Sequence, residues 1–493
     1  MDQGFILPSS SDVRRPDRFD LVVSDEYEVP FWDLLSAILK SESDPIVDVS
    51  SLVSALETIA IILRGSARDA GFELLRGFLL QYLVDDRGSA RFFAQEWPVL
   101  VDLALEMPSL FPEGVLPSFV CPDDGISEAV FSRRQVACLV VHQFLCSLPP
   151  HPWPTESFVD LSPWYSMTST VHEGAVSAYL TALFTYFERL SGEDQISPLD
   201  FSAEEWPIVF TLRTMSDNAV DQMQSDRAKS ALLSSTHIDI VKLPQLQTAP
   251  QFLGLPDGAC LISANKCVGF GPSGTQEELH VGTSPEAYPS VLLTPLLTDN
   301  QVLICRGAEA MVSIEGYGRD AQLGEAFRRP NPASNGELRW KNRTMLFMDA
   351  LELDVLPVEG NSLIPDIYPP SRLCRDMIFK AYSGFSSGAY SHIVTGLWGC
   401  RTFGGNRYVK CILQWCAAAL AGVPELRFIL ASTDQQLFGK ELVQFAEKVQ
   451  QSCVSATQMF DILAGLKDGI HDIGPDGIFS FIADQVDLAK HDR

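Results

Sequence analysis

The pattern of apolar positions changes character near residue 220. Before this point, apolar residues recur at helical spacing, as in Trp32, Leu35 and Ile38, which predicts helices from Phe31 onward. After it, short apolar runs alternate with helical stretches, which is typical of an α/β domain with a largely buried sheet. We therefore predict an extended polar arm over residues 1–24, an all-helical accessory domain over 25–220 and an α/β domain over 221–493.

The clearest helix of the N-terminal half spans residues 132–146. Ser132 can cap it, and its body is apolar on nearly all sides, so we expect it to be buried. His142 on this helix fits a buried core residue better than a metal ligand. Further helices are expected at residues 52–63, behind a Ser50-Ser51 cap, at 74–83 and at 178–190.

The C-terminal half alternates predicted strands and helices. Strands are expected at residues 237–241, 260–264, 302–305, 344–350, 393–395 and 426–431, and helices at 370–385, 406–421, 433–449 and 456–466. Asn406 can cap the second of these helices, and Gly422 and Pro424 can end it.

Composition excludes several classes of protein. The formal net charge is −27, from 63 acidic and 36 basic residues, which argues against direct binding to nucleic acid, whether sequence-specific or not. The 11 cysteines are an odd number without a CxxC pair, and the histidines form no HExxH, so we expect reduced thiols, an intracellular protein and no metal. The N-terminus lacks a secretory signal, and prolines from Pro149 onward interrupt the longest uncharged run, so we expect no membrane span.

Candidate chemistry lies in a glycine-rich stretch that follows the strand predicted at 260–264. Gly269, Gly271 and Gly274 can let main-chain N–H groups approach a phosphate closely, and Glu277 and Glu278 come directly behind them. A carboxyl beside such a loop can lose solvation and have its pKa raised, as a general acid near neutral pH requires. Glycine-rich loops and adjacent glutamates are also common without any function, so this pattern alone leaves both interpretations open.

A second glycine-rich loop, residues 396–406, lies between a predicted strand and a predicted helix. Main-chain amides and a helix N-terminus converge on anions at such positions, although tight turns also need glycine. A group of basic residues could supply local cations for a phosphate or lie in a solvated loop: Arg319, Arg328, Arg329, Arg339, Lys341 and Arg343. The segment 384–388 fits G-x-S-x-G, but it follows a helix rather than a strand, so we reject a hydrolase elbow there.

The order of residues in the two loops resembles one known family. Gly269-Phe270-Gly271, a short spacer and Gln276-Glu277-Glu278 resemble the signature of poly(ADP-ribose) glycohydrolases. The Trp-Gly-Cys at 398–400 and the Phe-Gly-Gly at 403–405 resemble the diphosphate-binding loop of that family, and the segment 314–318 resembles its Gly-Tyr element. The resemblance covers roughly residues 130–435.

The chain departs from the family pattern at several positions. Phe270 replaces the middle of three glycines, and the spacer before Gln276 is short. Ile262-Ser263 stands where the family has Asp-Phe, and Leu397 replaces an asparagine. A second active-site aromatic is expected near the end of the 426–431 strand, where our register places Leu430.

The resemblance implies a macrodomain-like mixed sheet between helices, preceded by an all-helical accessory domain, and it implies roles for individual residues. Glu278 would be the catalytic acid and base, Glu277 and Asn265 would hold ribose hydroxyls, and Gln276 would brace the loop. Tyr317 would lie against the ADP moiety, and Phe403 would pack on the scissile ribose. The remaining predicted substrate contacts, several of them through main-chain amides, are Gly269, Phe270, Gly271, Thr275, Cys400, Arg401 and Thr402.

The implied function is hydrolysis of ribose–ribose O-glycosidic bonds in poly(ADP-ribose), with release of ADP-ribose and without a cofactor. Poly(ADP-ribosyl)ated proteins would be partners in the reversal of ADP-ribosylation, the protein would be a monomer, and it would act in the nucleus, the cytoplasm or both. Two other classes remain open. A macrodomain can bind ADP-ribose without cleaving it, although a reader has no need for Glu278, and the protein could be an inactive scaffold.

Overall fold

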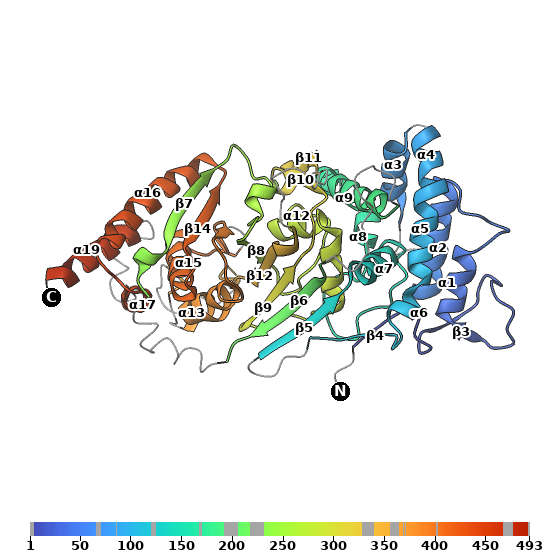
Figure 1. Cartoon of the computed structure of the whole chain (residues 1–493), viewed down its shortest axis with the longest axis horizontal. Helices are drawn as coiled ribbons and strands as arrows, with labels where there is room; N and C mark the ends of the chain where they lie inside the picture. The colour runs from blue at the N-terminus through green and yellow to red at the C-terminus, as the bar shows by residue number, and fades with distance from the viewer. Residues whose placement is uncertain are drawn as a thin grey trace.

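The structure is a computed structural model. It describes residues 4–65, 71–84, 86–119, 125–166, 170–191, 206–216, 231–327, 340–354, 364–367, 369, 371–400, 403–466 and 477–491. In Figure 1, the N-terminal helices lie at one end, an extended sheet crosses the middle, and the C-terminal helices lie at the other end.

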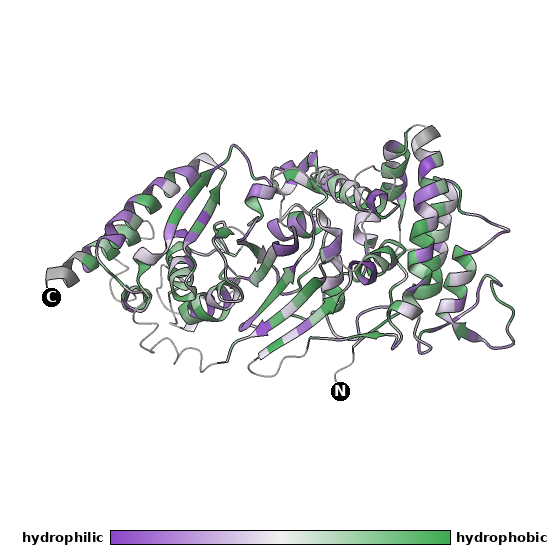
Figure 2. Cartoon of the chain, viewed as in Figure 1, coloured by the Kyte–Doolittle hydropathy of each residue, from purple (hydrophilic) through white to green (hydrophobic). Residues whose placement is uncertain are grey.

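One eight-stranded mixed sheet organises the described part of the chain. Its order is β5 (Gly125–Phe131), β6 (Ile208–Thr214), β9 (Gln301–Arg306), β12 (Thr344–Asp349), β8 (Ala259–Ala264), β13 (Ile393–Thr395), β14 (Glu425–Leu430) and β7 (His237–Lys242). The first four strands pair antiparallel, and every pairing from β12 to β7 is parallel. Figure 2 shows mostly hydrophobic residues along the central strands, as expected for a sheet covered on both faces.

Alternate residues of the central strands face two different cores. In β8, Cys260 and Ile262 contribute to the core shared with the N-terminal helices, whereas Ala259 and Leu261 contribute to the core beneath the C-terminal helices. Successive side chains of a strand point to opposite faces of the sheet, so one buried strand packs against a layer of helices on each face. The predicted sheet between helices is therefore confirmed.

The helices on the N-terminal side of the sheet form the helical domain. They are α1 (Phe31–Leu39), α2 (Val49–Arg64), α3 (Glu73–Tyr82), α4 (Asp86–Arg91), α5 (Trp97–Leu105), α6 (Met107–Leu110), α7 (Arg133–Phe144), α8 (Ser162–Tyr165) and α9 (Glu173–Ser191). The Ser132 cap is present, with Gln135 completing a capping box, and α7 is buried on nearly every side. The expected cap at Ser50-Ser51 is wrong: Asp48 caps α2, and Ser51 is the third helical residue that bonds back to it.

The other helices follow the sheet strands in the second half of the chain. They are α12 (Gln276–Gly282), α13 (Ser371–Cys374), α14 (Ser383–Phe385), α15 (Arg407–Ala421), α16 (Thr433–Gln450), α17 (Ala456–Gly465) and α19 (Ile478–His491), with π-helical turns over Arg375–Tyr382 and 3-10 turns over Pro285–Leu292. Asn406 caps α15, and Gly422 ends it in the left-handed conformation, as predicted.

Two features differ from the division expected from sequence. Strands β5 and β6 lie within the segment expected to be all helical, yet they extend the central sheet beyond β9, so the sheet crosses the boundary placed at residue 220. The N-terminal arm is extended but docked, because β1 (Phe5–Ile6) pairs with β4 (Val115–Leu116) and the Phe5 side chain is fully buried. Four further short strands form two antiparallel pairs and complete the described strands: β2 (Arg14–Pro16) with β3 (Glu28–Pro30), and β10 (Val312–Glu315) with β11 (Gln322–Ala326).

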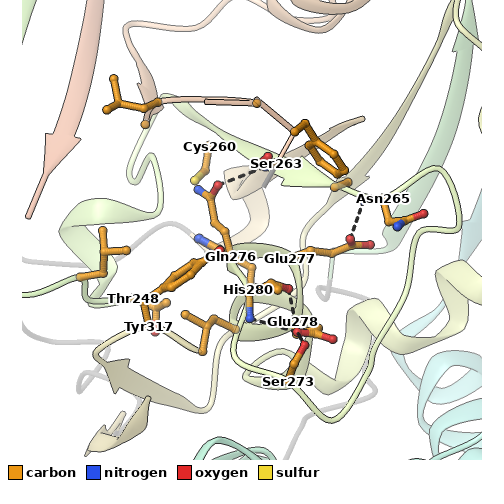
Figure 3. Close-up of a pocket in the computed structure, with 18 of the residues that line it drawn as sticks. Thr248, Cys260, Ser263, Asn265, Ser273, Gln276, Glu277, Glu278, His280 and Tyr317 are labelled. Carbon is orange, nitrogen blue, oxygen red and sulfur yellow. Dashed lines mark hydrogen bonds between the residues drawn. The ribbon is translucent and has the colours of Figure 1, made fainter. Parts of the chain in front are cut away.

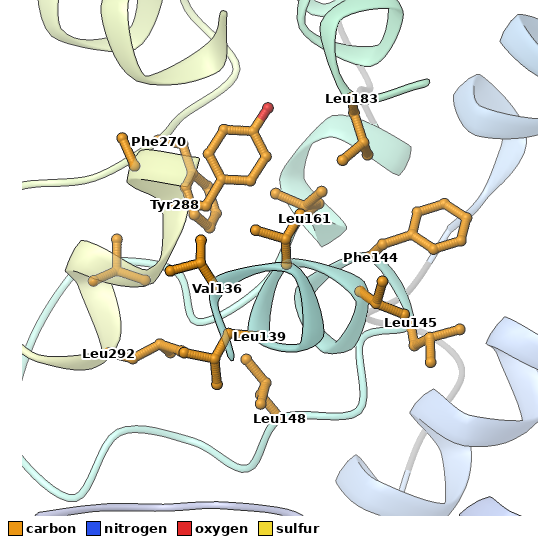
Figure 4. Close-up of a cluster of buried hydrophobic side chains, with 14 of the residues drawn as sticks. Val136, Leu139, Phe144, Leu145, Leu148, Leu161, Leu183, Phe270, Tyr288 and Leu292 are labelled. Carbon is orange, nitrogen blue, oxygen red and sulfur yellow. The ribbon is translucent and has the colours of Figure 1, made fainter. Parts of the chain in front are cut away.

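The helical domain and the sheet domain share one continuous core. Figure 4 shows side chains of α7, such as Val136 and Leu139, packed beside Phe270, Tyr288 and Leu292 of the sheet domain. A buried ion cluster reinforces this contact, because Arg133 of α7 pairs with both Glu286 and Glu309. The two domains therefore share buried side chains in one hydrophobic core and are not separate domains joined only by a linker.

Candidate functional site

A cavity of about 690 Å³ lies where both glycine loops meet. We call residues 265–275 the first glycine loop and residues 396–406 the second. Both follow parallel strands, β8 and β13, at their carboxyl ends, where ligands bind in open α/β sheets. The volume falls in the range of pockets that enclose a nucleotide-sized ligand.

Glu277 is buried beside the first loop, and both of its carboxyl oxygens accept main-chain hydrogen bonds. The Asn265 N–H donates to one oxygen at 2.7 Å, and the Gly269 N–H donates to the other at 2.8 Å. Burial raises the pKa of Glu277 to about 8, although these two N–H groups oppose the shift. The raised pKa expected near this loop therefore falls on Glu277, and its carboxyl fixes the path of the loop.

Glu278 lies at the third position of α12 and faces the cavity (Figure 3). One carboxyl oxygen, Oε2, accepts the Thr275 N–H at 3.0 Å, the Thr275 hydroxyl at 2.7 Å and the Ser273 hydroxyl. Oε1 accepts no hydrogen bond from the described residues. A Cβ at Gly271 would lie 2.3 Å from Oε1, so glycine is required at this position. One oxygen of Glu278 is thus fixed, and the other is available to a ligand.

Gln276 braces the loop against the sheet, as predicted. Its side-chain oxygen accepts the Ser263 N–H at 3.1 Å, and its amide donates to the Leu261 carbonyl at 3.3 Å. Asn265 is exposed at the cavity edge, where its side-chain oxygen accepts the Cys267 N–H at 3.0 Å. Thr275 caps α12, and its hydroxyl donates to Glu278, so this hydroxyl already has a hydrogen-bond partner within the protein.

The side chain of Phe270 is buried and packs away from the cavity, against the helical domain and the 3-10 turns at Pro285–Leu292. It is 4% exposed and packs against Trp164 and Tyr288, with each pair of ring centroids 5.5 Å apart. The predicted substrate contact at this position is therefore limited to its main chain. A phenylalanine is accommodated here because the helical domain offers an aromatic pocket for it.

Tyr317 lines the cavity from the turn between β10 and β11. This turn is tied to the first loop, because the Gly318 N–H donates to the Gly274 carbonyl at 2.7 Å. A Cβ at Gly274 would lie 2.5 Å from the Gly318 carbonyl oxygen, so the close approach needs glycine. The tyrosine predicted from the Gly-Tyr element is thus part of the same cavity as Glu278.

The second loop contributes Cys400 and Phe403 to the cavity lining, while Arg401 and Thr402 lie outside the described residues. Burial raises the pKa of the Cys400 thiol to about 12, so the thiol is neutral. Gly399 adopts φ +72°, and its carbonyl accepts the Gly405 N–H at 2.9 Å, which closes the loop.

A buried lysine supports the second loop from beneath. Lys410 of α15 pairs with Asp376, lies 3.5 Å from Asp366 and stands 5.0 Å from the centre of the Trp398 ring. A Cβ at Gly405 would lie 2.8 Å from Cε of this lysine. Burial would lower the pKa of Lys410, but Asp376 and Asp366 raise it, so the lysine stays charged. Sequence reasoning missed this group because its partners are distant in the chain.

Three other expectations need correction or addition. Arg343 of the basic group is buried and donates to Ser284 and Ala308, so it is no surface cation; Arg328, Arg329 and Arg339 lie outside the described residues. The aliphatic residue at the end of β14 that lines the cavity is Ile429, since Leu430 points into the core. His280, which the sequence did not single out, also lines the cavity, and burial lowers its pKa to about 3.

Two features are absent from the residues that the structure describes. No cluster of three or more His, Cys, Asp or Glu residues could hold a metal ion there. In the same part of the chain, no helix has the length and apolar character needed to cross a bilayer.

Family models match both parts of the chain. Residues 248–437 match the model described as "Poly (ADP-ribose) glycohydrolase (PARG), Macro domain fold", and residues 84–213 match its "helical domain" counterpart. Together the two matches cover more than half of the chain. The chain belongs to the poly(ADP-ribose) glycohydrolase family. Its two glycine loops are accordingly those of a macrodomain-fold member of this family, joined to the family's helical domain.

Curated relatives carry the same family name. Poly(ADP-ribose) glycohydrolase 1 of Caenorhabditis elegans is 23% identical over 364 residues, which are 71% of this chain and 42% of the relative. Poly(ADP-ribose) glycohydrolase 2 of the same organism is 24% identical over 310 residues, covering 61% of this chain and 57% of the relative. Poly(ADP-ribose) glycohydrolase 1 of Arabidopsis thaliana is 20% identical over 428 residues, covering 71% and 74%. The chain thus spans about half the length of the two nematode glycohydrolases.

Proposed function

We propose that the protein is a poly(ADP-ribose) glycohydrolase that hydrolyses ribose–ribose O-glycosidic bonds and releases ADP-ribose. The observation that supports this best is the position of Glu278. It faces a cavity bounded by both family loops, with one carboxyl oxygen fixed by Ser273 and Thr275 and the other open.

The proposed reaction uses one carboxyl group in two steps. Glu278 donates its proton to the ribose oxygen that leaves as the glycosidic C–O bond breaks, and the sugar passes through an oxocarbenium-like state. A water molecule then attacks the anomeric carbon and gives its proton to the Glu278 carboxylate, which restores the acid. The products are ADP-ribose and the shortened polymer.

Glu277 is less suited to this role. Both of its oxygens already accept main-chain hydrogen bonds, so rotating it toward a substrate would leave the N–H groups of Asn265 and Gly269 without this partner. We propose that Glu277 shapes the first loop and meets a ribose hydroxyl only at the edge of its carboxyl group.

The remaining cavity residues would bind the ADP portion. Main-chain amides of the first loop and of the second loop near Phe403 would hold the diphosphate, which lets a protein of net charge −27 bind an anionic polymer without a basic surface. Tyr317 would lie against the nucleotide and Phe403 against the scissile ribose. We further propose that poly(ADP-ribosyl)ated proteins are its partners, that it is a monomer and that it works in the nucleus or cytoplasm.

The test is to incubate the wild type and Glu278→Gln with purified poly(ADP-ribose). We expect ADP-ribose release by the wild type and a loss of about 10³-fold in the variant, with ADP-ribose still bound by both. Polymer that is bound but not shortened by the wild type would instead support a reader of ADP-ribose and contradict the proposed activity.

A further inference from the structure

Three side chains of the helical domain donate hydrogen bonds to main-chain carbonyls of the segment that leads to Glu278. In chain order, the pairs are Ser157 to Val268 at 3.3 Å, Trp164 to Gly271 at 2.8 Å and Tyr179 to Ser273 at 2.7 Å. The donors come from three separate stretches of the helical domain. The carbonyl side of this segment is therefore anchored outside the sheet domain.

Anchoring a carbonyl also orients the amide that follows it. In a planar trans peptide, the C=O and the next N–H point in opposite directions. The Val268 carbonyl points to Ser157, and the Gly269 N–H accordingly points the other way, to Glu277 at 2.8 Å. The helical domain thus determines which face of the loop presents N–H groups.

Tyr179 has the most direct connection to the catalytic carboxyl. Its hydroxyl donates to the Ser273 carbonyl, and the hydroxyl of the same serine donates to Glu278. Its ring also lies against the last residue of α12, since a Cβ at Gly282 would be 2.3 Å from Cδ1 of the ring. Tyr179 therefore contacts both the residue that orients Glu278 and the far end of the helix that carries it.

Trp164 supports the same arrangement. It is fully buried, its ring centroid lies 5.2 Å from that of Tyr179, and Phe270 packs on it. A buried indole N–H needs an acceptor, and the Gly271 carbonyl supplies it. The loop, the tyrosine and the tryptophan form one packed unit.

We propose that Tyr179 is a positioning residue for Glu278, so that the helical domain forms the outer wall of the catalytic site. The inference rests on the proposed hydrolysis. It assigns the helical domain a share in turnover: without the Tyr179 hydroxyl, Ser273 shifts and the Glu278 carboxyl loses its fixed orientation.

The test compares Tyr179→Phe with Tyr165→Phe. Tyr165 is a matched control, because its buried hydroxyl also donates to a main-chain carbonyl, that of Phe144 at 2.9 Å, but within the helical domain. We expect Tyr179→Phe to lower kcat on poly(ADP-ribose) about tenfold, with KM and the affinity for ADP-ribose changed less than twofold. Tyr165→Phe should keep the wild-type kcat while losing a similar amount of thermal stability.

A double variant adds a readout that a purely structural role would not move. If Tyr179 acts through Ser273, then Tyr179→Phe combined with Ser273→Ala should lower kcat no further than the more damaging single change. The proposal would be overturned if the double variant lost kcat by the product of the two single losses. Equal kcat losses in Tyr179→Phe and Tyr165→Phe would also overturn it.

Amide hydrogen exchange over residues 268–278 separates this inference from the proposed function, because it needs no turnover. We expect faster exchange there in Tyr179→Phe than in the wild type, and no change in Tyr165→Phe. If the wild type releases no ADP-ribose, the proposed hydrolysis fails. Unchanged exchange in Tyr179→Phe would contradict the positioning role, whatever the activity.

Discussion

The two glycine loops face one cavity but are supported in opposite ways. The first is held partly from outside, by side chains of the helical domain such as Trp164 and Tyr179, in addition to the hydrogen bonds that Glu277 accepts within its own domain. The second is held from within its own domain, by the buried charges of Lys410, Asp366 and Asp376. The loop that leads to Glu278 thus depends partly on a neighbouring domain, whereas the second loop depends on the fold beneath it.

The largest expected effect is on the second loop's support. Lys410→Met leaves Asp366 and Asp376 buried without their cation, and we expect a loss of about 4 kcal/mol in the free energy of unfolding. Denaturant unfolding measures it, with the exposed Lys440→Met as the control that should change little. A loss below about 1 kcal/mol would mean that the ion cluster does not support this part of the fold.

The matching change in the first loop is Phe270→Ala. Removing a ring buried between Trp164 and Tyr288 should lower the free energy of unfolding by about 3 kcal/mol. Phe403→Ala in the second loop should instead weaken ADP-ribose binding at little cost in stability, because Phe403 is only partly buried. Thermal unfolding measures the stability of both variants, and calorimetric titration measures their affinity for ADP-ribose. A large loss of stability in Phe403→Ala together with a loss of binding alone in Phe270→Ala would contradict this comparison.

Steric pressure on Glu278 gives a smaller effect. Gly271→Ala places a Cβ 2.3 Å from Oε1 of Glu278, and displacing that carboxyl should lower kcat about 100-fold. Gly77→Ala is the control, because a Cβ there meets nothing within 4 Å and alanine favours the exposed helix α3. Steady-state release of ADP-ribose reports the difference, and an unchanged kcat in Gly271→Ala would remove the steric argument.

The smallest expected effect, counted per pH unit, is the pH dependence of stability that Glu277 contributes. Burial raises its pKa from 4.5 to about 8, so between these values the folded state keeps a proton that the unfolded state has lost. Its contribution to stability is complete below pH 4.5 and falls as the pH rises to about 8, by at most about 1.4 kcal/mol per pH unit. Denaturant unfolding at several pH values should show this slope in the wild type and not in Glu277→Gln. Equal slopes would place the buried proton elsewhere.

Local sequence patterns predict much of the fold and part of the candidate site. The strand at 259–264, the cap at Asn406 and the end at Gly422 depend on neighbouring residues, so the sequence predicts them. Strands β5 and β6 were missed because they lie among helices and are fixed by pairing to the distant β9. Gly269, Gly271, Glu277 and Glu278 were singled out from the sequence and do line one cavity.

What could not be predicted depends on contacts between residues far apart in the chain. Phe270 stands beside two glycines, yet its environment is set by Trp164, more than a hundred residues earlier. Which of the adjacent carboxyls is buried follows from the path of the loop around Glu277 and not from the Glu-Glu pair itself. The burial and pairing of Lys410 could not be predicted from its helix alone, because its partners Asp366 and Asp376 lie far from it in the sequence.

The central claim is tested most directly by a crystal structure of the protein with bound ADP-ribose. We predict that Oε1 of Glu278 lies within about 3 Å of the oxygen on the anomeric carbon of the terminal ribose. The diphosphate should then accept hydrogen bonds from main-chain amides of both glycine loops. A Glu278 carboxyl turned away from the ribose, or ADP-ribose bound outside the cavity between the loops, would contradict the account.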